Sequence, residues 1–182
     1  AFARQEYEEG KFDEENKKHG LFLFLPLAHS FGRLIELAGP FFDAPLVISS
    51  VPTLAADLGA ARPGFFPGAP RVFEKMMGKV QSALASSPPA RQKIAGGALG
   101  VGKQAAQYRT KGKPVPMATG LQLKLADKLV LSKLRQRLGF DNASVLLCGS
   151  GPLRSDVHEF FLSIGLTLVE AYGLTETCPG LT

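Results

Sequence analysis

The stretch that decides the fold runs from residue 144 to residue 177 and reads SVLLCGSGPLRSDVHEFFLSIGLTLVEAYGLTET. A short apolar segment, 144–148, ends in a glycine turn, and a helix is expected from Ser155 to Ile164, with Ser155 as its cap. A second apolar segment, 166–172, ends in another glycine turn. A strand, a helix and a strand in this length predict one right-handed crossover between parallel strands.

Upstream, the same alternation of strands and helices begins at residue 21. The run LFLFLPLAH (21–29) is apolar without interruption, which favours a strand buried on both faces. Next come a short strand at 46–49, a helix with Thr53 as its N-cap, a strand-like GFFPG and a helix from Pro70. The sequence therefore predicts an α/β fold, with a parallel sheet flanked by helices and interrupted by a helical insertion.

The helical insertion contains the clearest helix of the chain, in LQLKLADKLVLSKLRQRLG (121–139). Two rows of apolar residues repeat every four positions, and Gly139 is the expected C-cap. The rows are Ala126, Val130, Leu134 and Leu138, and Leu121, Leu125 and Leu129. We divide the chain into an acidic segment (1–20), βα units (21–75), a basic helical insertion (76–143) and a βαβ unit (144–182).

The composition is that of an ordinary globular domain, with 45% hydrophobic and 20% charged residues in 182. The net charge of +5 is uneven, because residues 1–18 are acid-rich and the middle third is basic. Such a basic face suits phosphates, CoA, nucleic acid or an anionic membrane, and it also suits a plain solvated helix surface. Its members are Lys103, Arg109, Lys111, Lys113, Lys124, Lys128, Lys133, Arg135 and Arg137.

Cysteine usage and hydropathy point to a cytoplasmic protein. Cys148 and Cys178 show no metal-binding or redox spacing, so we expect reduced thiols. We find neither a signal peptide nor a membrane span in these residues. The chain opens without Met and as though within a helix, which predicts a piece of a longer protein.

The stretch GALGVGKQ (97–104) has the frame of a phosphate-binding P-loop. Gln104, however, stands where Ser or Thr would hold Mg²⁺, and the preceding SSPPARQKI is polar and broken by prolines rather than strand-like. We therefore expect a glycine-weakened helix or loop here, without a phosphate site.

Two glycine turns lie where predicted strands end, at the edge where parallel sheets bind ligands. In CGSGP (148–152), Gly149 and Gly151 allow close approach of a planar ring or a phosphate. In EAYGLTET (170–177), Tyr172 offers a face for a purine, Thr175 a donor for a phosphate and Glu176 an oxygen ligand for Mg²⁺. The residues predict a Mg-nucleotide site, with two ordinary βα turns and a core tyrosine as the alternative.

The stretch LPLAHSFGR (25–33) places His29 and Arg33 at the end of the first predicted strand. A single histidine there is commonly structural, and its position at a strand end also suits the lining of a pocket.

The stretch YGLTET (172–177) resembles the adenine and Mg²⁺ motif of the acyl-adenylate-forming enzymes, which include acyl-CoA synthetases, luciferases and peptide-synthetase adenylation domains. Four more segments match in order, and one of them, with the basic insertion before it, resembles long-chain fatty acyl-CoA synthetases in particular. They are LPLAHSFGR (25–33), RPGFFPGAPRVFEK (62–75), LADKLVLSKLRQRLG (125–139) and GSGPLRSDVHEFF (149–161). The resemblance runs from about residue 21 to the C-terminus.

The resemblance implies an ATP-dependent long-chain fatty acid–CoA ligase. In that family the fatty acid carboxylate attacks the α-phosphate of ATP, pyrophosphate leaves, and the CoA thiol then displaces AMP. It implies ATP, Mg²⁺ and CoA as cofactor and co-substrates, small-molecule partners without nucleic acid, and a parent able to contact a membrane peripherally or to form a homodimer.

The resemblance also implies a role for each matching residue. Thr175 and Glu176 would be catalytic, with Glu176 as the metal ligand, and His29 and Arg33 would belong to the acyl-substrate pocket. The ATP or AMP site would comprise Gly149, Ser150, Gly151, Pro152, Glu170, Ala171, Tyr172, Gly173 and Thr175.

The chain departs from the family pattern at Gly32, where these synthetases often carry Glu, and at Ala171, where many carry Gly. It also contains no counterpart of the Ser/Thr/Gly-rich phosphate loop, of the ribose-binding Asp or of the small C-terminal domain. We therefore expect an internal fragment that is inactive in isolation. Two alternatives stay open: an adenylate-forming ligase for medium-chain or aryl acids, and a non-catalytic basic binding module.

Overall fold

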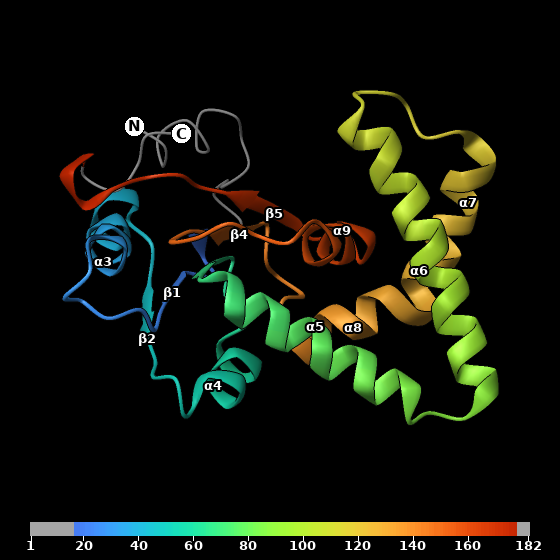
Figure 1. The fold of residues 1–182 in the computed structure, drawn as a ribbon, viewed down its shortest axis with the longest axis horizontal. Coiled ribbons are helices and arrows are strands. Elements are labelled where there is room, and N and C mark those ends of the chain that lie inside the picture. The colour runs from blue at the N-terminus through green and yellow to red at the C-terminus, as the bar shows by residue number, and fades with distance from the viewer. Residues whose placement is uncertain (1–16, 178–182) are drawn as a thin grey trace.

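The computed structural model describes residues 17–177, and its centre is a parallel sheet of five strands in the order β2-β1-β3-β4-β5 (Figure 1). Every neighbouring pair of strands is parallel, which confirms the predicted sheet. The strands are β1 (Leu21–Leu23), β2 (Leu46–Ile48), β3 (Phe65–Gly68), β4 (Val145–Cys148) and β5 (Thr167–Glu170).

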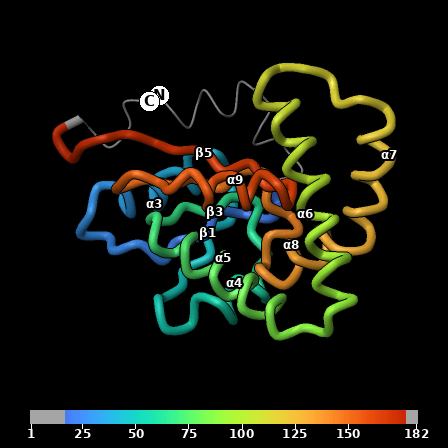
Figure 2. The backbone as a smooth tube through the Cα atoms, turned by 45° about the vertical axis from the view of Figure 1, so that its right-hand side comes forward, coloured from blue at the N-terminus to red at the C-terminus, as the bar shows by residue number. Residues whose placement is uncertain are grey.

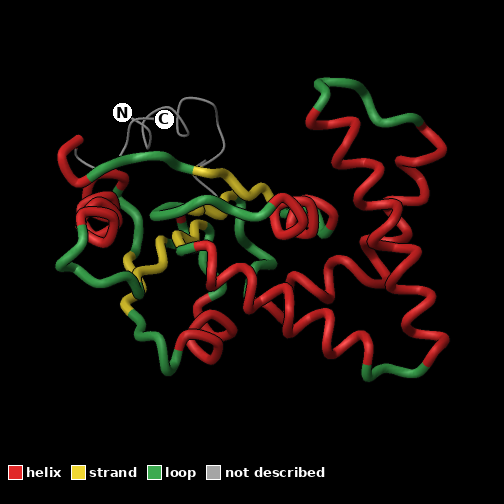
Figure 3. Tube along the Cα trace, viewed as in Figure 1, coloured by secondary structure: helices red, strands yellow, loops and turns green. Residues whose placement is uncertain are grey.

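Helices fill each crossover, as Figure 3 shows along the chain. Single helices follow β1, β2 and β4, namely α3 (Ser30–Phe42), α4 (Leu54–Ala61) and α9 (Ser155–Ser163). The long connection from β3 to β4 holds α5 (Pro70–Ala85), α6 (Pro89–Thr110), α7 (Met117–Ala126), the π-helix η1 (Asp127–Leu131) and α8 (Ser132–Leu138). A short 3-10 turn, η2 (Thr175–Thr177), follows β5.

The main core lies on one face of the sheet and is built largely from phenylalanine rings. Successive strand residues point to opposite faces, so Phe22 and Phe66 enter this core while Leu21 and Phe65 pack with α3 on the other face. Phe66 is fully buried, and its ring centroid lies 5.1–5.9 Å from those of four other phenylalanines. Helices α4, α5, α8 and α9 contribute most of the remaining core, with Ala98 of α6, Ala126 of α7 and Leu131 of η1.

Helices α6 and α7 form a hairpin that projects from the sheet on the far side of α9 (Figures 1 and 2). The stretch with the P-loop frame lies inside α6, so of the expected helix or loop the structure shows a helix. Gly102 packs so closely on α9 that a Cβ there would overlap the carbonyl oxygen of Ser163. Lys103 forms an ion pair with Glu159 of α9 at 2.9 Å. These two residues thus hold the hairpin against the α/β unit.

Three local predictions are corrected by the structure. The first strand covers residues 21–23 and not 21–29, because the chain turns at Pro26 and enters α3, a helix that the sequence analysis left unassigned. Ser155 is the first residue of α9 rather than its cap, since Arg154 holds the extended cap position. The helix predicted over 121–139 is divided by η1.

Two predicted helix caps are found at the expected residues. Gly139 is the C-cap of α8, with a positive φ of 76°. Thr53 holds the cap position of α4, although its hydroxyl bonds Ser50 and not a helix N–H. Helix α5 runs across the boundary drawn at residues 75 and 76. Cys178 and most of the acidic segment lie outside the described residues.

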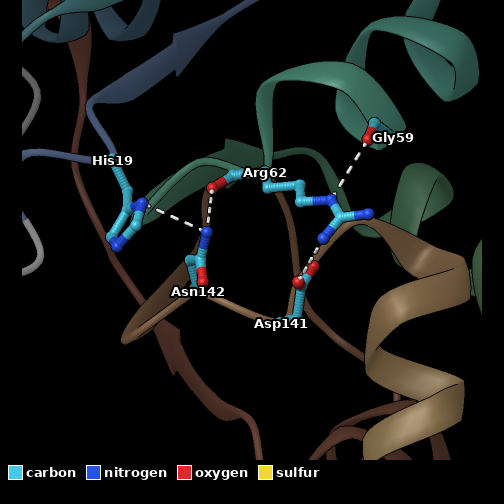
Figure 4. A network of polar contacts seen from close by, with 5 residues as sticks. All are labelled: His19, Gly59, Arg62, Asp141 and Asn142. Carbon is cyan, nitrogen blue, oxygen red and sulfur yellow. Dashed lines mark hydrogen bonds and ion pairs between the residues drawn. The ribbon is translucent and has the colours of Figure 1, made fainter.

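A polar network joins the segments that lead into the strands at the amino edge of the sheet (Figure 4). The Asn142 side-chain amide donates to Nδ1 of His19 at 3.1 Å and to the carbonyl oxygen of Arg62 at 3.3 Å. Arg62 in turn forms an ion pair with Asp141 at 3.0 Å. The network therefore ties together the entries to β1, β3 and β4, at the edge opposite the glycine turns.

Within residues 17–177, no helix is both long and apolar enough to span a membrane.

Candidate functional site

The two glycine turns lie side by side at the carboxyl edge of the sheet and are joined by hydrogen bonds. The N–H of Ala171 donates to the carbonyl oxygen of Cys148 at 2.8 Å. The N–H of Leu153 donates to Oε1 of Glu170 at 2.9 Å, so this carboxylate ties the first turn to the second. Gly149 N–H also donates to the Gly68 carbonyl at 3.1 Å, which anchors the first turn to β3.

A pocket of about 420 Å³ opens between these turns and the start of α3. Six of the predicted site residues line it, from three segments far apart in sequence. They are His29, Gly149, Ser150, Ala171, Gly173 and Thr175. The Oγ of Ser30 lies 3.4 Å from the hydroxyl oxygen of Thr175, and Figure 1 shows the last described segment reaching α3. A volume of this size suits a small-molecule ligand.

The first turn is shaped by a glycine and by a strained serine. A Cβ on Gly149 would lie 3.0 Å from the ring of Phe31, so the absence of a side chain lets this ring close one wall of the pocket. The positive φ of the turn belongs to Ser150, at 69°, and not to either glycine. A non-glycine residue in this region costs about 1–2 kcal/mol, and such strain is often found at ligand-binding turns.

The second turn presents its functional groups to solvent. Tyr172 is 61% exposed, so it is not the core tyrosine of the alternative interpretation. Thr175 and Glu176 are exposed in η2. Thr175 lines the pocket, whereas Tyr172 and Glu176 lie on the same turn outside its lining residues. Gly151, Pro152 and Glu170 also stand outside the lining residues, within or next to the two turns.

His29 and Arg33 take different positions around α3. His29 precedes the first residue of the helix and lines the pocket. Arg33 lies one turn into α3, is exposed, and its guanidinium pairs with Glu36 at 2.8 Å. The structure therefore does not bring Arg33 into the pocket. It does supply a carboxylate partner for Arg33, at position 36 rather than 32.

Gly32 explains the first departure from the family pattern. It is buried, and a Cβ at this position would overlap the carbonyl oxygen of Pro26. A glutamate at residue 32 would need the loop 24–29 to move. The glycine is thus required by the close approach of α3 to this loop.

The thiol of Cys148 lies under the first turn and is unreactive. Its residue is fully buried at the end of β4. Burial, followed by the negative charge of Glu170, raises the pKa of the Cys148 thiol to about 12. The thiol is therefore neutral at physiological pH and is not a nucleophile.

A second hollow, of about 450 Å³, lies among α4, α5 and α8. Its walls are mainly apolar, and it contains none of the predicted site residues. Chemistry needs polar groups that converge, so the smaller pocket at the carboxyl edge is the better candidate site.

Ser30 and Phe31 are pocket residues that the sequence analysis did not single out. Both lie inside the quoted segment LPLAHSFGR, directly after His29. Recognising that a helix starts at Ser30 would have brought them to the same edge as His29.

Comparison with known sequences links the chain to one family. A family model described as AMP-binding enzyme matches residues 2–182. The long-chain-fatty-acid–CoA ligase ACSBG2 of Rattus norvegicus is 34% identical over 170 residues, which cover 90% of this chain and 25% of the relative. Long chain acyl-CoA synthetase 3 of Arabidopsis thaliana is 31% identical over 172 residues, which cover 92% of this chain and 25% of the relative. The chain thus spans about a quarter of the length of these relatives.

Comparison with solved structures confirms the fold class. The adenylation domain of a carboxylate reductase from Mycobacterium chelonae has a TM-score of 0.56 at 21% identity, over 85% of this chain and 20% of that chain. The A domain of carboxylic acid reductase from Segniliparus rugosus, solved with AMP and a co-purified carboxylic acid, has a TM-score of 0.54 at 18% identity, over 87% of this chain and 21% of that chain. At these identities the likeness concerns the fold alone.

Proposed function

The chain belongs to the AMP-binding enzyme family, and from that premise we propose that it forms the adenylate and acyl part of an ATP-dependent long-chain fatty acid–CoA ligase. The names of the similar ligases in rat and Arabidopsis support the substrate class. The observation that carries the proposal is the pocket, in which the start of α3 and both glycine turns converge.

Each turn has a defined task in the proposed site. The exposed ring of Tyr172 stacks on the adenine, and the hydroxyl of Thr175 donates to a phosphate oxygen. The carboxylate of Glu170 is a positioning group, because its hydrogen bond to the Leu153 N–H sets the distance between the turns. The unhindered backbone at Gly149 admits the flat ring system next to Phe31.

His29 and Ser30 form the acyl side of the proposed site. They stand at the start of α3 and line the pocket together with residues of the glycine turns. A fatty acid carboxylate bound beside His29 would face the α-phosphate held by Thr175. Fixing the two reactants in this way lowers the entropic part of the barrier, and a donor at the phosphate stabilises the charge that builds there. Arg33, paired with Glu36, is proposed to stand at the entrance for the acyl chain.

Glu176 is the residue that we propose to hold Mg²⁺. The described residues contain no cluster of three metal-binding side chains. Mg²⁺ commonly uses one or two carboxylates together with substrate phosphates, so a single exposed carboxylate beside a phosphate-binding hydroxyl fits this metal. When bound, Mg²⁺ supplies positive charge to the phosphate oxygens.

Titration of the 182-residue chain with AMP, followed by calorimetry, tests the proposed adenine site. Removing the ring in Tyr172→Leu should weaken AMP binding at least about tenfold, from the usual strength of base stacking on an aromatic ring, whereas Tyr172→Phe should keep most of the affinity. Thr175→Val removes the donor and keeps the shape, and it should weaken binding about tenfold, the value of a hydrogen bond to a charged group.

Thr167→Val is the matched control, because Thr167 is an exposed residue of β5 that does not line the pocket. It should bind AMP like the unchanged chain. If the Tyr172 and Thr175 variants also bind AMP like the unchanged chain, the adenine site does not lie at this edge.

Turnover is a separate question from binding. We propose that the 182 residues alone do not turn over, since they contain no Ser/Thr/Gly-rich phosphate loop. Formation of acyl-AMP or acyl-CoA from the chain with ATP, Mg²⁺, CoA and palmitate would contradict this. In the full-length protein, pyrophosphate release measured over a series of fatty acid lengths and aryl acids distinguishes a long-chain ligase from a medium-chain or aryl-acid ligase.

We propose a cytoplasmic location for this activity. Support comes from Cys148, which is buried and forms no disulfide with a described residue.

A further inference from the structure

The outer side of α7 and η1 carries a row of exposed apolar side chains, which we call the outer row. It consists of Met117, Leu121, Leu125 and Leu129, with exposures of 92%, 72%, 61% and 50%. Residues four apart share one side of a helix, so the four side chains form one continuous strip. Single exposed apolar residues are ordinary, but a strip of this length marks a surface that contacts something other than water.

The second apolar row of the same segment is covered. Ala126 and Leu134 are buried, and Val130 and Leu138 pack at the margin of the main core. One row of this segment thus packs against the core, and the outer row stays exposed to solvent. The outer row is not needed to hold the hairpin in place.

Positive charge surrounds the outer row. The segment 89–138, which holds α6, α7, η1, α8 and the loop after α6, contains eleven Lys and Arg residues and one acid, Asp127. That acid is already paired with Arg135 at 2.7 Å. Lys124 and Lys128 are exposed among the leucines, and neither forms an ion pair with a described residue. The strip is therefore apolar and cationic at once.

The hairpin is also placed to reach a surface. It projects beyond α9, at the other end of the molecule from α3 (Figures 1 and 2), and the first residues of α3 line the ligand pocket. A flat partner can contact the outer row without covering the pocket at the carboxyl edge of the sheet.

We propose that the outer row and its lysines form a contact site for an anionic lipid surface. Leucines in this setting lie at the boundary between headgroups and acyl chains, and the lysines extend to the phosphates. Nucleic acid would use the lysines but would leave the leucines in water, since such interfaces are polar. The inference stands on this surface alone and does not depend on the proposed ligase activity.

Sedimentation of the 182-residue chain with lipid vesicles tests the site. Binding is expected with phosphatidylcholine vesicles that contain about a third of phosphatidylserine, and much weaker binding with phosphatidylcholine alone. The neutral double variant Leu121→Ser/Leu125→Ser should lower the partition coefficient more than about tenfold. Lys124→Gln and Lys128→Gln should each lower it about fivefold, the usual value of one cation near an anionic surface.

The matched control is Leu37→Ser/Phe41→Ser on α3, which removes two side chains of similar exposure, 68% and 74%, from the other end of the molecule. It should bind vesicles like the unchanged chain. Circular dichroism of all variants shows whether the fold is kept, which is expected because the altered side chains are exposed.

The chain has no tryptophan, which provides a second and independent measurement. In Leu125→Trp the single indole should shift its emission to shorter wavelength when phosphatidylserine vesicles are added, whereas the indole of Leu37→Trp should not. Three results would overturn the proposal: unchanged vesicle binding by the leucine double variant, vesicle binding without a shift at residue 125, or the same shift produced without lipid by raising the protein concentration. The last result would identify a second copy of the chain as the occupant.

Discussion

The sheet and the hairpin of α6 and α7 are packed in two different ways. Around the sheet the largest fully buried side chains are phenylalanines, among them Phe22, Phe66 and Phe73. In α6 the buried residues are all small, namely Ala95, Ala98, Gly102, Ala105 and Ala106. Large apolar side chains stabilise the sheet by burial, whereas small ones let the hairpin approach its neighbours closely. The leucines of the hairpin therefore stay exposed and can contact another surface. The tightly packed sheet holds the segments that line the pocket.

Among these substitutions, Phe66→Ala should lower the free energy of unfolding the most. Its ring contacts four other buried phenylalanines, so its loss leaves a cavity at the centre of the sheet half. We expect a loss of about 3–5 kcal/mol in the free energy of unfolding. Leu125→Ala, which removes an exposed leucine of the hairpin, should change it by less than about 0.5 kcal/mol. Denaturant unfolding measures both values, and equal effects would remove the distinction between the two regions.

Gly102→Ala should break the close packing of the hairpin on α9. The new Cβ would overlap a backbone carbonyl, which cannot rotate away as a side chain can. We expect a loss of about 3 kcal/mol, at the upper end for overpacking. In Gly97→Ala, on the same helix, the Cβ meets no atom, and the change should stabilise the protein by about 0.5–1 kcal/mol. If both substitutions changed the unfolding free energy in the same direction, α6 would not pack on α9 through Gly102.

Asn142→Ala tests whether polar groups contribute to the sheet half. Its amide bonds His19 and the carbonyl of Arg62, and both partners lose a hydrogen bond in the variant. A loss of about 1–2 kcal/mol is expected from thermal or denaturant unfolding. Gln104→Ala in α6 is the control, since this exposed side chain forms no hydrogen bond with a described residue and the change in unfolding free energy should be near zero. A null result at residue 142 would mean that water replaces the network at no cost.

The thiol of Cys148 should make the unfolding free energy depend on pH only in alkaline solution. Its pKa is raised from 9.0 to about 12 in the folded chain, so the folded state binds the proton more tightly than the unfolded state. This contribution to stability is fully present below pH 9 and is lost as pH rises through 12. The difference in unfolding free energy between the unchanged chain and Cys148→Ala should therefore be constant from pH 6 to 8 and shrink above pH 9. A difference that stays constant to pH 11 would contradict the raised pKa.

Local patterns in the sequence predicted most of the frame. The strands near 46, 65, 145 and 167, the C-cap at Gly139 and the two glycine turns are all present. The helix α3 was missed because Gly32, Gly39 and Pro40 weaken its pattern, and the π-helix η1 has no clear signal in a regular row of leucines. Both glycine turns line one pocket at the expected edge of the sheet. Ser30 and Phe31 were not among the predicted residues, because the helix that begins at Ser30 was not predicted.

By itself, the sequence determined that the chain is a parallel α/β domain with two glycine turns at one edge, because strand and helix periodicities and glycines are local properties of the chain. The tertiary structure alone decided which of the two apolar rows in 121–139 is covered, since both have the same spacing and only the neighbouring helices distinguish them. It also decided that Gly102 serves helix packing and that Arg33 pairs with Glu36 outside the pocket. Each of these depends on which distant groups come within a few ångströms, and distances in space are not encoded in local spacing.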